Sequence, residues 1–292
     1  MSAQQLITAE LRQWIGAQLA QGCSQEQLLA AMQSSGWDAS VAATALAQTL
    51  DPSLVQPMAA SPAISQAVRD AAAGSAVPEP DLSGGRPVIR VGDREVRVLL
   101  SLRHPRVVVF GGLLSDEECD GMVAQSEARL ARSETVAAKD SGSEVNAART
   151  SEGMFFERGE NELIRRIEAR LAALINWPVD HGEGLQVLRY RPGAEYLPHY
   201  DYFDPGMSST PAILKRGGQR VGTLVMYLNT PAAGGATIFP DIGLDVLPVK
   251  GNAVFFSYDR PQPQTLTLHG GAPVREGEKW VATKWLRQGV FV

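Results

Sequence analysis

Three side chains in this sequence have the types and spacing of a metal site. His199 and Asp201 stand two residues apart in the run 196–201 (YLPHYD), and His269 follows seventy residues later. Side chains two apart on an extended strand project from the same face. A second imidazole from a neighbouring strand would complete a 2-His-1-carboxylate set, which suits Fe(II) and leaves three coordination positions open. The sequence therefore predicts a metal site formed by His199, Asp201 and His269.

A lysine follows the second histidine closely. Lys279 lies ten residues after His269, directly after the turn signal 276–278 (EGE), on a strand expected to lie beside that of His269. A fixed cation near the metal could hold the far carboxylate of a dicarboxylic acid that chelates the metal through its other end. The alternative is a solvated hairpin charge, the usual environment of a lysine. Lys284 lies an odd number of residues further and is expected on the opposite face of the strand.

From about Val107 to the C-terminus the sequence resembles the 2-oxoglutarate-dependent prolyl 4-hydroxylases, including bacterial members and the catalytic part of the collagen enzyme. A single His-x-Asp pair is weak support, but the ordered set of segments is specific. The matching segments, besides the one at His199, are 149–156 (RTSEGMFF), 185–190 (LQVLRY), 223–228 (TLVMYL), 234–237 (GGAT) and 279–285 (KWVATKW). The resemblance implies a double-stranded β-helix core that uses Fe(II), 2-oxoglutarate as cosubstrate and L-ascorbate as reductant.

The resemblance also assigns cosubstrate residues. Tyr190 matches a phenol that hydrogen-bonds the distal carboxylate of 2-oxoglutarate, and Thr223 matches a hydroxyl on the neighbouring strand. Both could instead be ordinary strand residues, because Tyr and Thr favour sheets.

Three further residues match positions near the substrate. Tyr196 and Trp285 correspond to aromatic side chains that could grip a proline-rich peptide in its polyproline II conformation, although both rings could simply fill the barrel mouth. Arg149 closes a polar loop rich in Gly, Ser and Ala, and in the family the matching segment folds over bound peptide.

The two remaining histidines are weaker ligand candidates. His104 is expected to be a surface or structural residue. His181 and Glu183 repeat the ligand spacing, but Gly182 and Gly184 flank the glutamate and predict a turn, so that the two side chains need not share a face. The first set of ligands is therefore favoured.

Length and composition limit the class of protein. A chain of 292 residues favours one large core with an appendage. The net charge of −5 and the lack of Lys/Arg clusters argue against nucleic-acid binding. Cys23 and Cys119 lie too far apart to suggest a disulfide framework or a thiolate metal site, which fits a cytoplasmic protein. No signal peptide or membrane span is expected, and the oligomeric state stays undetermined.

The chain is expected to have three parts. Residues 1–52 predict a three-helix bundle, faintly similar at Gly36-Trp37 to ubiquitin-associated modules, although a generic helical appendage is at least as reasonable. Ser24 with Gln27 forms a capping-box pattern, and Asp38 can cap a helix over 39–50. Residues 53–86 form a Pro/Ala/Ser-rich linker, with one helix expected at 63–73. Residues 87–292 would be the oxygenase domain.

The expected fold class of this last part is α+β. Helices are predicted at 115–131, where Ser115 is the N-cap, and at 160–175. Turn signals separate the strands, and those after residue 184 close most simply as a jelly roll. The predicted strands are 87–100, 107–110, 185–190, 221–228, 236–239, 245–249, 253–258, 265–269 and 279–287.

The predicted function is that of a dioxygenase, dependent on Fe(II) and 2-oxoglutarate, that hydroxylates a prolyl residue in a protein or peptide and releases succinate and CO2. Two alternatives stay open. The substrate could be a free amino acid or small metabolite, although Tyr196 and Trp285 count against it. The β-core could also be a silent scaffold with a partner-binding N-terminal bundle, but the intact metal set and Lys279 count against that.

Overall fold

The chain divides into two units, Met1–Ala73 and Gly74–Val292. The computed structural model describes residues 15–16, 18–19, 23–34, 37–50, 76–132, 135–136, 143–144 and 150–292. Among the described helices, none has the length and apolar character that a membrane span requires.

The first unit contains two described helices, α2 (Gln25–Ser34) and α3 (Ala39–Leu50). The predicted capping box is present, because the Ser24 N–H donates to Gln27 Oε1 at 2.9 Å and the Gln27 N–H donates to Ser24 Oγ at 3.2 Å. Asp38 Oδ1 accepts from the Val41 N–H at 3.4 Å, as expected of an N-cap. Most of the predicted first helix lies outside the described residues, so the three-helix arrangement stays a prediction.

Two antiparallel sheets make up most of the second unit. The nine strands of the large sheet are, in spatial order, β1 (Val88–Val91), β2 (Arg94–Leu102), β3 (Arg106–Gly111), β14 (Ala253–Ser257), β10 (Arg220–Tyr227), β17 (Lys279–Arg287), β8 (Leu185–Tyr190), β7 (Glu152–Phe156) and β4 (Ala131–Arg132). The four strands of the small sheet are β13 (Leu244–Val246), β12 (Thr237–Phe239), β15 (His269–Gly271) and β9 (Tyr196–His199). Two short pairs join β11 (Ala233–Gly234) to β16 (Val274–Glu276), and β5 (Thr135–Val136) to β6 (Ser143–Glu144).

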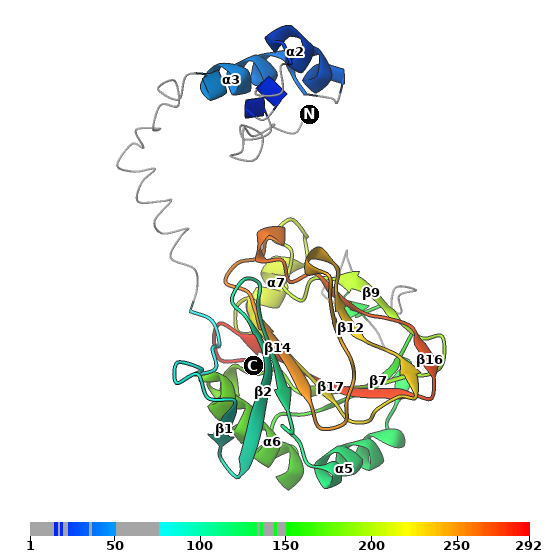
Figure 1. Cartoon of the computed structure of the whole chain (residues 1–292). Coiled ribbons are helices and arrows are strands. Elements are labelled where there is room, and N and C mark those ends of the chain that lie inside the picture. Colours follow the sequence, from blue (N-terminus) through cyan, green and yellow to red (C-terminus); the bar gives the residue numbers. More distant parts are fainter. Residues whose placement is uncertain are drawn as a thin grey trace. The chain divides into compact units, whose positions relative to one another are not determined.

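Two described helices cover one face of the large sheet. In Figure 1, α5 (Asp116–Glu127) and α6 (Glu162–Ile175) lie on one side of β17, while β9 and β12 lie on the other. One apolar core fills the space between the helices and the large sheet, and it includes Met122, Ile167, Leu171 and Phe255. A second core lies between the two sheets. The unit is thus a mixed helix-and-sheet fold in which the two sheets face each other.

Alternation along β17 explains how one strand serves both cores. Trp280, Ala282 and Leu286 belong to the helix-side core, whereas Val281 belongs to the core between the sheets. The one remaining described α-helix of this unit, α7 (Thr210–Leu214), is short, and three single-turn 3-10 helices lie at Val179–His181, Pro240–Ile242 and Pro263–Thr265.

Several predicted elements occur with the predicted bounds, and others do not. The strands at 185–190 and 279–287 are confirmed, and Ser115 caps α5 through a complete capping box. The predicted strand at 265–269 is wrong: Pro263–Thr265 is a 3-10 turn, Leu266 has a left-handed φ of 53°, and the strand begins only at His269. The predicted strand at 87–100 is two strands, because the chain turns at Gly92, where φ is 58°.

Candidate active site

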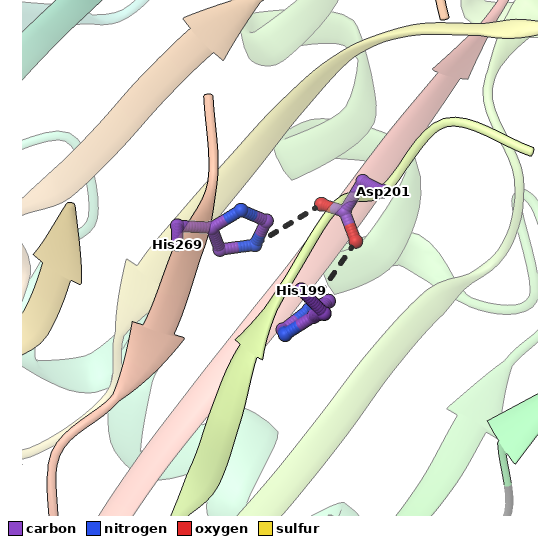
Figure 2. Close-up of side chains that lie close together, drawn as sticks. All are labelled: His199, Asp201 and His269. Carbon is purple, nitrogen blue, oxygen red and sulfur yellow. Dashed lines mark ion pairs between the residues drawn. The ribbon is translucent and has the colours of Figure 1, made fainter. Parts of the chain in front are cut away.

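The three predicted ligands meet where the small sheet ends. His199 ends β9 and His269 begins β15, and the two residues are cross-strand partners. The His199 Nε2 atom lies 3.6 Å from Asp201 Oδ1, and the His269 Nε2 atom lies 3.4 Å from Asp201 Oδ2 (Figure 2). Candidate ligand atoms of all three residues lie within 4.8 Å of one another, and the described chain holds no other group of three such residues.

Both imidazoles are oriented by the backbone. His199 Nδ1 lies 2.9 Å from the Leu197 carbonyl oxygen, and His269 Nδ1 lies 3.0 Å from the Thr267 carbonyl oxygen. Each Nδ1 must therefore carry the proton and donate it. The lone pair of each Nε2 is then free for a metal, as in most protein metal sites with histidine ligands.

Burial and charge set the protonation of the site. Burial lowers the pKa of His269 to about 4, so this imidazole is neutral near pH 7. Burial alone would raise the pKa of Asp201, but His269, His199 and Arg220 together hold it well below its usual range. Histidine binds a metal in its neutral form, so two imidazole ligands and one carboxylate would give the metal one negative charge, which fits a divalent cation.

Asp201 lies beyond the end of β9, so side-chain alternation along that strand does not determine the direction of its side chain. Its side chain is held by β10 instead: Thr223 Oγ1 donates to Asp201 Oδ2 at 2.7 Å, and the Tyr258 hydroxyl lies 3.0 Å from Thr223 Oγ1. Thr223 is fully buried and contacts a predicted metal ligand, whereas the resemblance implied a contact with the cosubstrate.

This hydrogen bond leads to a first prediction. Thr223→Val should weaken Fe(II) binding by roughly 10–100-fold, because loss of an outer partner lets a ligand reorient. Thr223→Ser keeps the hydroxyl and should retain most of the affinity. An anaerobic Fe(II) titration of both variants measures the effect, and wild-type affinity in Thr223→Val would show that Asp201 does not need this support.

Lys279 shares a pocket with the metal ligands. Residues of both sheets line this pocket: Leu188, Tyr190, Tyr196, His199, Asp201, Val225, Thr237, His269, Gly270, Gly271, Lys279, Val281, Thr283 and Trp285. The predicted neighbour of the Lys279 strand is wrong, because β17 pairs with β8 and β10 in the large sheet. Lys279 therefore belongs to the sheet that faces His269 across the pocket.

The Lys279 ammonium group has no anionic neighbour in the part of the chain that the structure describes. Its Nζ lies 5.5 Å from the centre of the Tyr190 ring and 5.9 Å from that of Tyr227. The residue is 4% exposed, and burial lowers its pKa to about 8. An unpaired cation in such a place is costly, and an anion bound in the pocket would offset that cost.

Comparison with known proteins agrees with this geometry. The sequence pattern of the 2OG-Fe(II) oxygenase superfamily matches residues 185–287. Prolyl 4-hydroxylase 5 of Arabidopsis thaliana is 38% identical over 221 residues, which cover 68% of this chain and 74% of that protein. The chain belongs to the prolyl 4-hydroxylase family of 2-oxoglutarate- and Fe(II)-dependent oxygenases.

Two further proteins are similar to this chain. Prolyl 4-hydroxylase 1 of Arabidopsis thaliana is 41% identical over 219 residues, covering 69% of this chain and 75% of that protein. The crystal structure of a viral collagen prolyl hydroxylase from Paramecium bursaria Chlorella virus-1, in complex with 2OG, is 31% identical and has a TM-score of 0.48. The match covers 62% of this chain and 95% of that one.

The pocket contains two threonine hydroxyls that were not predicted from the sequence. Thr283 follows Lys279 at an even spacing on β17, and Thr237 lies on β12 in the opposite sheet. Thr237 Oγ1 accepts a hydrogen bond from the Tyr227 hydroxyl at 2.9 Å. The even spacing from Lys279 could have identified Thr283, and the segment 234–237 could have identified Thr237.

Two of the three predicted substrate residues are described by the structure, and both lie near the predicted metal ligands. The Tyr196 ring stacks on His199, with ring centres 3.7 Å apart, so it lies beside the metal site. Trp285 lines the same pocket, and its buried Nε1–H has no hydrogen-bond acceptor within the described chain. Arg149 lies outside the described residues, so its role stays a prediction.

The alternative ligands are engaged elsewhere or exposed. Glu183 Oε1 accepts from Arg220 Nε and from Arg287 Nε, each at 2.7 Å. The His181 ring packs edge-on against Trp177, and His104 is exposed. Lys284 is on the opposite face of β17, as predicted, where its Nζ lies 2.5 Å from Glu168 Oε1.

Proposed function

We propose that this protein hydroxylates prolyl residues of a protein or peptide, with Fe(II) held by His199, Asp201 and His269. The observation that carries the proposal is one pocket lined both by this ligand set and by Lys279, which is buried and has no anionic partner among the described residues. A dicarboxylic acid that chelates a metal at one end needs such a cation for its other end. Curated relatives named prolyl 4-hydroxylases support the substrate class.

The residues present fit the implied groups. The Nε2 atoms of His199 and His269 and the Asp201 carboxylate would bind Fe(II), and three protein ligands leave positions for cosubstrate and dioxygen. Bound Fe(II) supplies the dioxygen chemistry, in which 2-oxoglutarate is oxidatively decarboxylated to succinate and CO2 as one oxygen atom enters the proline ring. The protein contributes orientation and exclusion of water.

Lys279 would hold the distal carboxylate of 2-oxoglutarate. Tyr190 is its cross-strand partner on β8 and also lines the pocket, which supports the predicted phenol contact. Thr237 and Thr283 offer further hydroxyls at the pocket wall. Thr223 would act through Asp201, because its hydrogen bond goes to that carboxylate.

Tyr196 and Trp285 would contact the prolyl substrate. A buried N–H without an acceptor costs about 1–3 kcal/mol, so a carbonyl oxygen of bound peptide would be a favourable partner for Trp285 Nε1. Arg149, which precedes β7 in the sequence, would complete the site. Aromatic surfaces bind polyproline II segments at low entropic cost, which favours a peptide over a free amino acid.

The test compares a panel of short proline-containing peptides with free proline as substrates of the purified enzyme with Fe(II) and 2-oxoglutarate. Mass spectrometry should find a gain of one oxygen, localised to proline, in at least some peptides. Oxygen gain by free proline alone would favour the small-metabolite alternative. No succinate with any substrate would favour the scaffold alternative.

Three finer points belong to the same proposal. We interpret the two facing sheets as the double-stranded β-helix predicted from the sequence. L-ascorbate would keep the iron reduced after turnover that is not coupled to hydroxylation. A cytoplasmic location stays a prediction, which imaging of the tagged protein would test.

We further propose that the domains are 1–52, 53–86 and 87–292, with the N-terminal bundle recruiting the target. Glu79 of this proposed linker lies within the second unit, where its N–H donates to the Ile175 carbonyl and its carboxylate pairs with Arg106. A deletion of residues 1–75 keeps these contacts.

This deletion should therefore leave the hydroxylation of a short peptide unchanged, because every proposed site residue lies beyond residue 148. It should weaken hydroxylation of the full-length target, since tethering raises the effective concentration of the enzyme. A deletion of residues 1–86 is the matched control and should lower the melting temperature. Loss of short-peptide activity in a folded 1–75 deletion would refute the assignment.

A further inference from the structure

The second residue after β9 poses a structural problem. Asp201 supplies the carboxylate of the proposed metal site, yet it lies outside the strand that carries His199. Loops are usually too mobile to hold a ligand to a fraction of an ångström, so other contacts must fix its position.

The beginning of β10 provides these contacts. Gln219 binds both backbone groups of Phe203, accepting from its N–H at 2.7 Å and donating to its carbonyl at 2.8 Å. Arg220 Nη1 donates to the Asp201 carbonyl at 3.4 Å, and Thr223 holds the Asp201 side chain. Asp201 and Phe203 are therefore both fixed by residues 219–223, which include the first half of β10.

Arg220 is itself fixed from two directions. Its Nε and Nη2 atoms donate to the two oxygens of Glu183, at 2.7 and 2.9 Å. Its Cζ atom lies 4.0 Å from the centre of the Trp285 ring and 4.8 Å from that of Phe203. These are close cation–π distances, and Arg is suited to them because its guanidinium is planar.

Arg287 offers a matched comparison for Arg220. A bulge in the β10–β17 pair places the two arginines directly opposite each other, where like charges repel. Arg287 donates to the same Glu183 carboxylate and lies 4.7 Å from the same Phe203 ring. Its contacts in the described chain, however, include neither Asp201 nor Trp285.

We propose that Arg220 is a positioning residue that sets both Asp201 at the metal site and Trp285 at the pocket. Its ion pair with Glu183 fixes the guanidinium, the guanidinium supports the Trp285 ring, and Nη1 holds the Asp201 carbonyl. The inference rests on the proposed metal triad and does not depend on the identity of the substrate.

The test exploits the shared carboxylate. Removing either arginine leaves Glu183 paired with the other one, so Arg220→Met and Arg287→Met should both fold, with similar melting temperatures. In an anaerobic Fe(II) titration, Arg220→Met should bind about 10–100-fold more weakly than wild type, as expected for loss of a group that orients a ligand. Arg287→Met should stay close to wild type.

Steady-state kinetics give a second measurement, because a general loss of stability would not raise one KM and leave the other unchanged. At saturating Fe(II), Arg220→Met should raise the KM for a prolyl peptide, through Trp285, and leave the KM for 2-oxoglutarate unchanged. Equal Fe(II) affinity in the two variants, whether both keep it or both lose it, would overturn the proposal. If Arg220→Met does not fold, Arg220→Lys keeps the charge beside Glu183 and should show the same selective loss to a smaller extent.

The failure of the proposed function would look different. A wild-type protein that binds Fe(II) and oxidises no prolyl peptide would remove the substrate proposal, while the Fe(II) titrations of the two variants would still decide the role of Arg220. A wild-type protein that binds no Fe(II) would refute the triad and this inference together.

Discussion

His269→Ala should abolish turnover and weaken Fe(II) binding by more than about 100-fold. Loss of a group that only orients a ligand weakens metal binding by up to about 100-fold, and this variant loses a ligand itself. Burial lowers the pKa of His269 to about 4, so this imidazole is neutral at pH 7 and its loss removes a lone pair and no charge. An anaerobic Fe(II) titration and a succinate assay measure the two effects.

The matched control for this variant is His181→Ala. His181 is the other histidine with a carboxylate two residues away, but its neighbour Glu183 is paired with two arginines. This substitution should leave Fe(II) affinity and turnover nearly intact. Wild-type iron affinity in His269→Ala, or loss of affinity in His181→Ala, would show that the ligands are assigned wrongly.

Lys279→Met should separate cosubstrate binding from metal binding. Breaking a buried charge pair typically costs about 3–5 kcal/mol, so the affinity for 2-oxoglutarate should fall more than about 100-fold while Fe(II) still binds. Met approximates the length of Lys without its charge, so packing in the pocket should be kept. Calorimetric titration of the Fe(II)-loaded variant with 2-oxoglutarate gives the result, and unchanged affinity would refute the role of Lys279.

The same variant should be more stable than wild type when no cosubstrate is bound. Burial lowers the pKa of Lys279 from 10.5 to about 8, which means that the charged form is disfavoured in the folded protein by up to about 3 kcal/mol. This penalty is complete below pH 8 and disappears as the pH rises from about 8 to 10.5, because the unfolded chain holds the proton longer. The stability gain of Lys279→Met at pH 7 should therefore shrink over that range.

Binding of 2-oxoglutarate should show the corresponding pH dependence. The distal carboxylate needs the ammonium form of Lys279, which predominates below pH 8 in the free enzyme. Wild-type affinity should be constant from pH 6.5 to 7.5 and fall about tenfold per pH unit well above pH 8. Lys279→Met should lack this decline, which distinguishes the lysine from other titrating groups.

Sequence reasoning found the chemical residues because their types are rare and their chemistry is demanding. His199, Asp201, His269 and Lys279 do line one pocket. The reason given for Asp201 was incomplete, because the residue lies past the strand and Thr223 and Arg220 hold it. Local spacing identifies a residue that can bind a metal, whereas its support comes from contacts that are distant in the sequence.

The order of strands in the sheets was harder to predict than the side-chain directions within a strand. Alternation on β17 correctly separated Lys279 from Lys284, since side-chain direction is a property of a single strand. The neighbour of β17 was predicted wrongly, because pairing depends on long-range register that single strands do not encode. The contacts of Arg220 with Glu183, Phe203 and Trp285 could not be predicted for the same reason.

The central claim is that this chain couples the decarboxylation of 2-oxoglutarate to the hydroxylation of proline in a peptide. The most direct measurement supplies oxygen-18-labelled dioxygen to the wild-type enzyme with Fe(II), 2-oxoglutarate and a prolyl peptide, and follows both products by mass spectrometry. We expect one labelled atom in the hydroxyproline and one in succinate, with at least as much succinate as hydroxyproline, and neither product with Asp201→Ala. Hydroxyproline that carries unlabelled oxygen from water, or succinate formed without any change in the peptide, would contradict it.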